Sequence, residues 1–327
     1  MSDLALASFA AATDTHLVGM PRTARFAVYR ATFDEGAEVE RLRALGFRFL
    51  GRSSGAFPPL LGAIYDPPPG LYLRGDAKPE LLRRRAVAVV GARACSAYGR
   101  QVARRLGREL GAAGLVVVSG LARGVDAEAH RGALDVSAPT IAVLGCGIDR
   151  DYPAAHRALA AEIAAVGLLI SEYAPGIEPA PWRFPARNRI VAGLCGAAIV
   201  VEARERSGAL ITADFALEEG REVFAVPGEI TSALSAGSNA LLRLGATPLT
   251  TTADVLESYG IVAEEKPDPV LGDIQRLVFG HVREAPRAAD DLVRTTGLGA
   301  AAVAAILTEL ELIGLVTEEE GLYRVAG

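Results

Sequence analysis

Residues 86–99 read AVAVVGARACSAYG, and this stretch determines the fold class that the sequence predicts. The apolar run 86–90 has no polar alternation, so we expect a strand that is buried on both faces. A glycine at position 91 ends the run, and a helix is expected to begin near Tyr98. A buried strand, a glycine turn and a helix in this order indicate a parallel sheet with helices on both sides.

The same arrangement repeats along the chain to about residue 250. We expect strands at 86–90, 115–118, 140–144, 167–170, 197–201, 222–226 and 248–251. Helices such as 98–112 and 153–166 lie between them. The sequence therefore predicts an α/β fold, with an extended Rossmann-like, doubly wound parallel sheet over residues 81–260. Ligands of such sheets bind at the carboxyl ends of the strands.

The regions on either side of the predicted sheet differ from it. Residues 1–80 look helical and end in proline-rich segments, so we expect a helical N-terminal domain there. Segment 261–269 is charged and contains two prolines, which is typical of a linker. In residues 270–327 we expect three helices followed by two short strands, which is the layout of a winged helix.

The net charge of −5 over 327 residues excludes a protein that is strongly basic throughout, but it does not exclude a local basic groove. Residues 263–327 carry 6 basic and 12 acidic side chains. The would-be recognition helix, 299–312, contains Glu309 and Glu311 and no lysine or arginine. A helix that reads the major groove of DNA needs basic or amide side chains. We therefore expect this domain to bind another protein or to have a regulatory role.

Cysteines and histidines are few and show no metal-binding spacing. Cys95, Cys146 and Cys195 include no CxxC pair, and the 4 histidines have no HxxxH spacing. We therefore expect no disulfide framework, no metal and no cofactor. The N-terminus lacks the basic start of a signal peptide, and the longest apolar run, 190–201, is too short to span a membrane. These features predict a cytoplasmic protein with no membrane attachment.

Five short loops carry glycine, serine or arginine in a form suited to binding phosphate, at 91–93, 119–124, 145–147, 187–189 and 207–209. Glycine lets backbone N–H groups approach an anion, a helix N-terminus adds positive potential, and arginine supplies counter-charge. The chain has neither GxGxxG nor GxxxxGK[ST], which argues against NAD and P-loop nucleotide binding. So many loops predict a surface for a nucleotide polymer, or for a nucleotide with much around it.

Aromatic residues accompany the arginines of one segment, because Trp182 and Phe184 directly precede 187–189. Arginine beside an aromatic ring is typical of single-strand binding, in which phosphates are neutralised while bases stack. The alternative is that Phe184 packs into the core and the arginines form salt bridges. The arginines that we expect to line one groove are Arg93, Arg123, Arg187 and Arg189.

Two features leave an enzymatic alternative open. Ser119, Asp126 and His130 could form a hydrolase triad, but no GxSxG elbow is present. Asp126 and His130 are four residues apart, which suits a role in positioning a helix. Glu202 follows a predicted strand and could act as a general base.

The ordered motifs resemble those of the bacterial DNA-processing protein A family, also known as DprA or Smf. The matching segments are GARACSAYG at 91–99, SGLARGVDAEAH at 119–130, GCGIDRDYP at 145–153, SEY at 171–173, FPARNRI at 184–190, EARERSGALITA at 202–213 and VPG at 226–228. They cover nearly all of the central domain. FPPL at 57–60 departs slightly from the family, which usually has tyrosine at the position of Phe57.

The resemblance implies a SAM-like N-terminal domain, a Rossmann-like domain and a winged helix. It also implies a homodimer that binds single-stranded DNA, protects it in natural transformation (competence) or homologous recombination, and loads RecA, without hydrolysing nucleotides. The alternative is a Rossmann-like nucleoside-phosphate hydrolase, although residues 207–212 do not match that family's PGGxGTxxE motif. A sequence-specific repressor is a third possibility. We expect the dimer surface near 239–244 and 253–259.

The residues predicted to contact DNA come from all five loops. They are Gly91, Arg93, Ser96, Ser119, Gly120, Arg123, Gly147, Phe184, Arg187, Asn188, Arg189, Ser207 and Gly208. No catalytic residue and no metal ligand is predicted.

Overall fold

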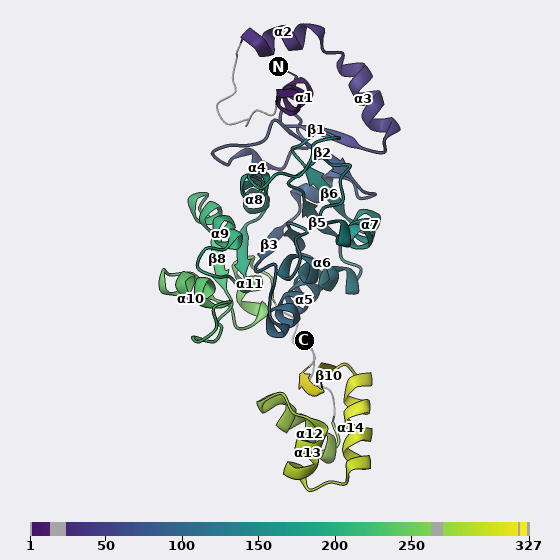
Figure 1. Ribbon diagram of the computed structural model, residues 1–327, viewed down its shortest axis with the longest axis vertical. Coiled ribbons are helices and arrows are strands. Elements are labelled where there is room, and N and C mark those ends of the chain that lie inside the picture. The colour runs from purple at the N-terminus through teal and green to yellow at the C-terminus, as the bar shows by residue number, and fades with distance from the viewer. Residues whose placement is uncertain (1, 14–23, 263–270, 320, 326–327) are drawn as a thin grey trace. The chain divides into compact units, whose positions relative to one another are not determined.

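The computed structural model describes residues 2–13, 24–262, 271–319 and 321–325. It divides the chain into two compact units, Met1–Ala263 and Glu264–Gly327. The first unit contains the predicted sheet with its helices, and the second contains the predicted winged helix (Figure 1).

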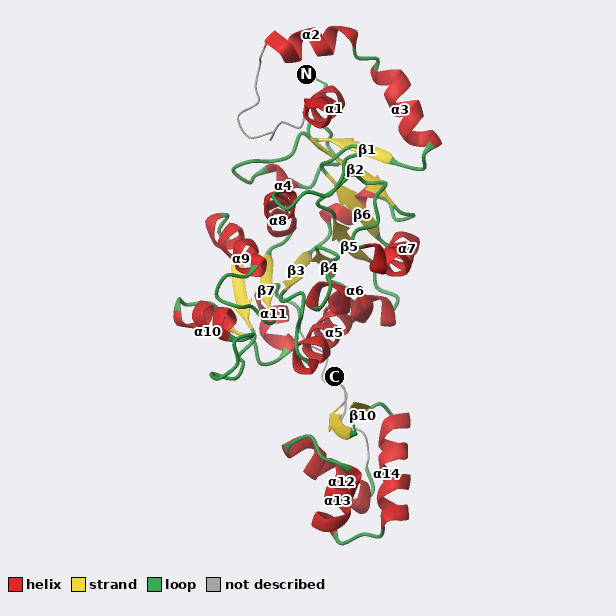
Figure 2. Cartoon of the chain, viewed as in Figure 1, coloured by secondary structure: helices red, strands yellow, loops and turns green. Residues whose placement is uncertain are grey.

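A mixed sheet forms the centre of the first unit (Figure 2). In the described residues its nine strands lie in the order β1-β2-β6-β5-β4-β3-β7-β8-β9. Strands β3 to β9 pair in parallel, as the sequence predicts. They are β3 (Ala86–Val90), β4 (Val116–Ser119), β5 (Thr140–Val143), β6 (Leu168–Ser171), β7 (Ala197–Val200), β8 (Glu222–Ala225) and β9 (Thr247–Pro248).

Helices cover both faces of this sheet, and successive residues of each strand face opposite cores. Val87 and Val89 pack on one side, and Ala88 and Val90 pack on the other. The first face is covered by α5 (Ala97–Ala112), α6 (Val125–Asp135), α7 (Arg157–Val166) and α11 (Thr252–Ser258). The second is covered by α4 (Pro59–Gly62), α8 (Arg183–Gly193), α9 (Gly208–Glu218) and α10 (Ala236–Arg243).

The N-terminal region is less helical than its sequence predicts. It contains α1 (Asp3–Thr13), α2 (Ala24–Thr32) and α3 (Glu35–Ala44), but also β1 (Arg48–Gly51) and β2 (Gly70–Arg74). β2 joins the central sheet antiparallel to β6, with Tyr72 opposite Ser171. The helical prediction was wrong here because the apolar run 71–73 is too short to show a helical period, and the prolines before it favour extended backbone.

Helices α5 and α6 approach each other closely through glycine. A Cβ atom on Gly107 of α5 would lie 2.1 Å from the carbonyl oxygen of Ala129. A Cβ atom on Gly132 of α6 would lie 1.9 Å from the carbonyl oxygen of Arg104. Both distances are far below van der Waals contact, so no larger residue fits at either position without separating the helices.

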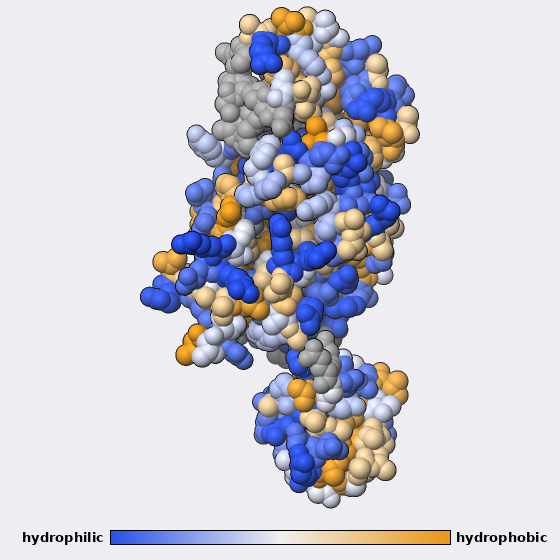
Figure 3. Space-filling view, viewed as in Figure 1, coloured by the Kyte–Doolittle hydropathy of each residue, from blue (hydrophilic) through white to orange (hydrophobic). Residues whose placement is uncertain are grey.

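The second unit is a winged helix, as predicted. Its elements are α12 (Asp273–Glu284), α13 (Ala289–Thr296), α14 (Ala300–Leu312), β10 (Val316–Glu319) and β11 (Leu322–Val325). Val303, Leu307 and Leu310 of α14 face its small core. The opposite side of α14 is exposed and mostly alanine, and pale orange residues lie along this helix in Figure 3.

Within the described ranges, no single helix is long and apolar enough to cross a membrane. The pair α13 and α14 meets the length and composition criteria together, but it is bent by 117°.

Candidate nucleic-acid interface

The strand order reverses between β3 and β7, because the chain runs outward from β3 to β6 and then returns to β7 on the other side. Doubly wound proteins bind ligands outside the carboxyl ends of the strands at such a position. A cavity of about 210 Å³ lies there, which we call the switch-point cleft. Its lining residues are Val90, Gly91, Arg93, Gly120, Ala122, Asp126, Phe184, Pro185, Arg187, Asn188, Val191, Ser207, Gly208, Ala209 and Thr212.

A second cavity, of about 470 Å³, shares part of this lining. We call it the aromatic pocket, because the rings of Tyr152 and Phe184 line it. The rest of its lining is Arg93, Ala94, Gly120, Ala122, Arg123, Pro153 and Arg187. The structure therefore brings loops 91–93 and 119–124 together with α8, as the sequence predicts.

Helix α9 begins at the switch-point cleft. Ser207 caps it, because the Ser207 hydroxyl accepts a hydrogen bond from the backbone N–H of Ala209 at 3.3 Å. Gly208 has open space on its Cα side, with nothing within 4 Å of an ideal Cβ. A helix N-terminus that faces open space is suited to an anion, so this part of the prediction matches the geometry. Asn188 joins the two helices by donating from Nδ2 to the carbonyl of Gly208 at 3.0 Å.

Arg93 and Arg123 are exposed and line the aromatic pocket. The guanidinium carbon of Arg93 lies 5.4 Å from the centroid of the Phe184 ring, which is a cation–π distance. The loops that carry the two arginines touch, since the N–H of Val125 donates to the carbonyl of Ala92 at 3.2 Å. Gly124 makes this approach possible, because its φ is +75° and a Cβ there would lie 2.2 Å from that carbonyl oxygen.

Arg187 differs from these two arginines. Its side chain is only 4% exposed, and Nη1 donates to the carbonyls of Gly120, at 3.0 Å, and Val143. Burial lowers the pKa of Arg187, and the carboxylate of Asp126 opposes that shift. Arg187 thus lines both cavities beside Arg93, as the sequence predicts, and its buried guanidinium also ties the ends of β4 and β5 together.

Arg189 does not line either cavity, so the prediction that it shares the groove of Arg93 is wrong. Its guanidinium is 7% exposed and spans two carboxylates. Nη2 lies 2.6 Å from Glu172 Oε2, and Nε lies 3.0 Å from Asp66 Oδ2. Arg189 therefore forms salt bridges, as the alternative interpretation of the sequence predicted for these arginines.

Two other predicted contacts face the interior. Ser119 is fully buried, and its hydroxyl donates to the carbonyl of Val89 at 2.6 Å. Gly147 packs under residues 174–177, where its N–H donates to the carbonyl of Ile177 at 2.8 Å. Both positions hold loops in place, and neither lies in the lining of the switch-point cleft or the aromatic pocket.

The hydrolase triad does not assemble. Asp126 accepts hydrogen bonds from the N–H groups of Gly120, at 3.1 Å, and Ala122, at 3.3 Å, and so fixes the loop before α6. His130 instead contacts Thr140 Oγ1 through Nδ1 at 2.7 Å. With the Ser119 hydroxyl also directed elsewhere, these side chains serve the scaffold, in agreement with the helix-positioning interpretation.

Glu202 is also committed to structure. It is buried, and it accepts hydrogen bonds from the Ser96 N–H at 2.9 Å and from the Ser96 hydroxyl at 2.5 Å. The same hydroxyl caps α5 by accepting from the N–H of Gly99 at 3.0 Å. Glu202 lines neither the switch-point cleft nor the aromatic pocket, so its carboxylate is out of reach of a substrate bound in either cavity. The Ser96 hydroxyl was predicted to contact DNA, but it donates to Glu202 instead.

Sequence reasoning missed Tyr152. Its ring stacks on that of Phe184, with centroids 5.2 Å apart and planes 28° apart. Tyr152 stands in the segment GCGIDRDYP, which matched the family but suggested no role. An aromatic residue after the end of β5 was the available signal, since strand ends converge at one sheet edge.

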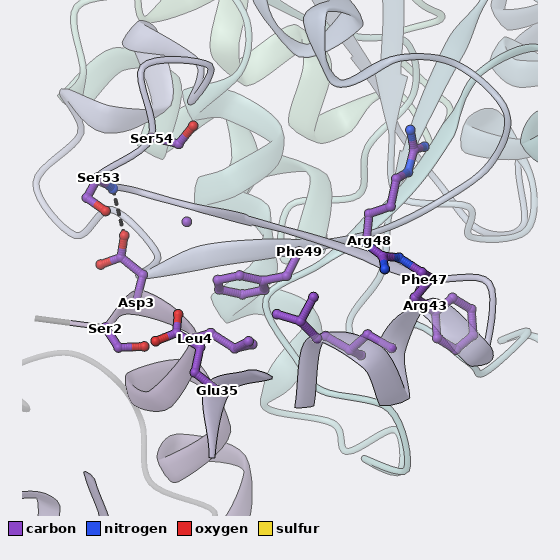
Figure 4. Close-up of a pocket in the computed structure, with 13 residues that line it drawn as sticks. Ser2, Asp3, Leu4, Glu35, Arg43, Phe47, Arg48, Phe49, Ser53 and Ser54 are labelled. Atoms are coloured by element: carbon purple, nitrogen blue, oxygen red, sulfur yellow. Dashed lines mark hydrogen bonds between the residues drawn. The ribbon is translucent and has the colours of Figure 1, made fainter. Parts of the chain in front are cut away.

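A third cavity, of about 530 Å³, lies among α1, α3 and β1 (Figure 4). Asp3 and Glu35 line it, and the Asp3 carboxylate accepts a hydrogen bond from the N–H of Ser53 at 2.7 Å. Arg43 and Arg48 also line this cavity, so its charges balance, and none of the phosphate-binding loops predicted from the sequence reaches it. Among the described residues, no group of three or more His, Cys, Asp or Glu side chains could hold a metal ion.

Comparison with known proteins identifies relatives over both units. The sequence model of DNA recombination-mediator protein A matches residues 48–260, and that of the DprA winged helix domain matches residues 262–321. The putative DNA processing protein DprA of Mycobacterium tuberculosis is 43% identical over 264 residues, which are 78% of this chain and 68% of that protein.

The fold resembles solved structures of DNA processing protein A from two other bacteria. DNA processing protein A from Streptococcus pneumoniae has a TM-score of 0.67 and 39% identity, over 78% of this chain and 91% of the other. DNA processing protein A from Helicobacter pylori has a TM-score of 0.59 and 32% identity, over 65% of this chain and 95% of the other. The Helicobacter structure is described as giving insight into a unique single-stranded DNA binding mode.

Proposed function

The chain belongs to the DNA recombination-mediator protein A family, and on that premise we propose that it binds single-stranded DNA along the switch-point cleft and the aromatic pocket. The observation that carries this proposal is the pairing of two exposed arginines, Arg93 and Arg123, with stacked aromatic rings in one pocket. The start of α9 at Gly208 adds a site for a further phosphate. Single-strand binding of the Helicobacter relative supports the proposal.

We propose that single strands are preferred to duplex. A single strand exposes the faces of its bases, which can stack on aromatic side chains, whereas the bases of a duplex are stacked on each other. Helix α8 borders the cavities with Arg187 and Asn188, but both side chains donate to backbone carbonyls of the protein itself, so little sequence preference is expected. The DNA contacts proposed are those of Gly91, Arg93, Gly120, Arg123, Asn188, Ser207 and Gly208.

A fluorescence anisotropy titration tests this function. Single-stranded and duplex oligonucleotides of equal length are titrated across a salt series. We expect tighter binding of the single strand, with a slope of log affinity against log salt of about −0.7 per neutralised phosphate. Equal affinity for duplex, or no dependence on salt, would contradict the proposal.

We also propose that the protein acts as a homodimer that passes its strand to RecA in transformation or recombination, and therefore works in the cytoplasm. These finer statements rest on the family resemblance. The dimer surface expected at 253–259 needs revision, because Val255 and Leu256 of α11 belong to the core. Leu244, after α10, is exposed and is the better candidate. Light scattering at micromolar concentration tests the dimer, and replacement of Leu244 by glutamate should weaken it.

We propose that the protein catalyses no reaction of its own. The nucleoside-phosphate hydrolase alternative depended on Glu202, whose carboxylate is bonded to Ser96 at the start of α5. Incubation with nucleoside monophosphates followed by chromatography tests this statement. Release of base or phosphate that disappears in Glu202→Gln would restore the hydrolase alternative.

A further inference from the structure

Phe184 is the aromatic residue that sequence reasoning assigned to base stacking, but its ring is already engaged. The Tyr152 ring stacks on it, and the Arg93 guanidinium lies over it at 5.4 Å. The ring also packs against the backbone of the loop after β5, because a Cβ on Gly145 would lie 2.7 Å from Phe184 Cδ1. Little of the Phe184 ring is left for a base.

Tyr152 is the outer member of this stack. Its side chain lines the aromatic pocket and is 42% exposed, whereas Phe184 is half-buried. An aromatic ring that rests on a second ring and still presents area to a pocket is suited to receive one more planar group. A pocket of about 470 Å³ has the volume of a small-ligand site, so one unstacked base fits there.

The segment that carries Tyr152 is held in place from two directions. The neighbouring Asp151 carboxylate lies 2.6 Å from Arg74 of β2 and 3.5 Å from Arg157 of α7. On the other side, His156 Nδ1 lies 3.0 Å from the carbonyl of Leu121, in the loop that carries Arg123. A pre-positioned ring loses little conformational entropy when a base stacks on it.

Charge in the same pocket complements this ring. Arg93 and Arg123 are exposed in its lining, where they can neutralise the phosphates that flank a bound base. Aromatic faces together with arginines along one groove form the usual combination for binding single strands.

We propose that Tyr152 is the base-stacking platform of this site, with one unstacked base on its ring while Arg93 and Arg123 neutralise the adjoining phosphates. This inference rests on the proposed single-strand binding and extends it to a residue and a contact. Phe184 then acts as a support that orients Tyr152 and Arg93.

The test compares two single strands of about 20 residues with equal phosphate number, one of thymidine and one wholly abasic. Because it loses a stacking contact, Tyr152→Ala should bind the thymidine strand about tenfold more weakly than the wild type does. Its affinity for the abasic strand should fall less than about twofold. The salt slope should not change, because the contact is uncharged. Tyr152→Leu, which keeps apolar bulk without an aromatic face, should show the same pattern.

Two controls separate stacking from other effects. Tyr152→Phe keeps the ring and should bind thymidine like the wild type. Tyr65→Ala removes a tyrosine that is 93% exposed and lies outside the aromatic pocket, and should bind unchanged. Circular dichroism verifies that each variant is folded.

Two outcomes would contradict the proposed role of Tyr152 and leave the proposed single-strand binding intact. One is an equal loss on both strands, which would make Tyr152 a support only. The other is unchanged binding by Tyr152→Ala and Tyr152→Leu. Failure of the wild type to bind the thymidine strand would instead overturn the proposed function itself.

Discussion

The switch-point edge of the first unit and helix α14 of the second are the positions at which their folds commonly bind ligands: the first binds phosphate-containing ligands, and the second is the recognition helix of DNA-binding relatives of its fold. Their side chains differ completely. The first presents Arg93 and Arg123 beside aromatic rings, whereas the exposed side of α14 carries alanine and Glu309. A fold therefore offers a place for DNA, and the side chains at that place decide whether DNA is held.

The largest expected effect concerns the scaffold beneath the first of these surfaces. Replacing Arg187 by alanine leaves buried Asp126 without its nearest strong cationic neighbour, which should cost about 3–5 kcal/mol of unfolding free energy. Urea unfolding followed by the fluorescence of Trp182, the sole tryptophan, measures this loss in the first unit. The matched variant Arg93→Ala, at an exposed arginine, should change stability by less than about 0.5 kcal/mol. Equal stability of the two variants would refute the distinction between buried and exposed arginines.

Acid should also destabilise the first unit, through His130. Thr140 Oγ1 donates to the carbonyl of Val117, so it can only accept from His130 Nδ1, and the ring is neutral with its proton on Nδ1. Nε2 is buried without a hydrogen-bond partner among the described residues. Burial therefore lowers the pKa of His130 to about 3.

The unfolded chain binds a proton at His130 below a pKa of about 6.5, and the folded chain does not until about 3. The unfolding free energy should therefore fall as the pH decreases between these values, by up to about 1.4 kcal/mol per pH unit. Urea titrations at several pH values, read by Trp182 fluorescence, measure the slope. His130→Gln can still donate to Thr140 but does not titrate, so its slope should be shallower. Identical slopes would exclude His130 as the cause.

On the binding side of the comparison, Arg93→Glu should weaken single-strand affinity by more than about tenfold, because an attraction to phosphate becomes a repulsion. Circular dichroism should show an intact fold. Arg43→Glu on α3 makes the same charge change at an exposed site outside both cavities and should have a much smaller effect. Normal binding by Arg93→Glu would remove the loop after β3 from the interface.

The smallest effect is expected from the second unit. Deleting residues 263–327 removes 6 basic and 12 acidic side chains, so single-strand affinity should stay within about threefold and could rise through lost repulsion. Anisotropy at one fixed salt concentration measures this. A loss of more than about tenfold would show that the winged helix binds DNA and would end the contrast between the two surfaces.

The sequence predicted the parallel strands well, because runs such as 86–90 are continuously apolar and need no long-range information. It predicted β2 poorly, because the place of that strand depends on pairing with β6, almost 100 residues away in the chain. The meeting of loops 91–93 and 119–124 followed from their positions at the carboxyl ends of two parallel strands. This part of the site was therefore within reach of sequence reasoning.

The sequence could not distinguish exposed from buried arginines. Arg189 and Arg93 look alike in their motifs, yet Arg189 meets Asp66, which lies 123 residues before it in the chain. Only the tertiary structure brings such partners together. Tyr152 was missed for the same reason, since its stacking on Phe184 joins two segments that no local pattern connects.

The glycines at the crossing of α5 and α6 have a consequence for the spacing of Arg93 and Arg123. α5 follows the loop of Arg93, and α6 follows the loop of Arg123. Backbone atoms of the two helices meet directly at Gly107 and Gly132, so no rotamer change can alter the distance between their axes. The interval between the two arginines proposed to bind phosphate is thus set by main-chain contact about three turns into α5 and about two turns into α6. A single methyl group at Gly132 would lengthen that interval without touching the groove.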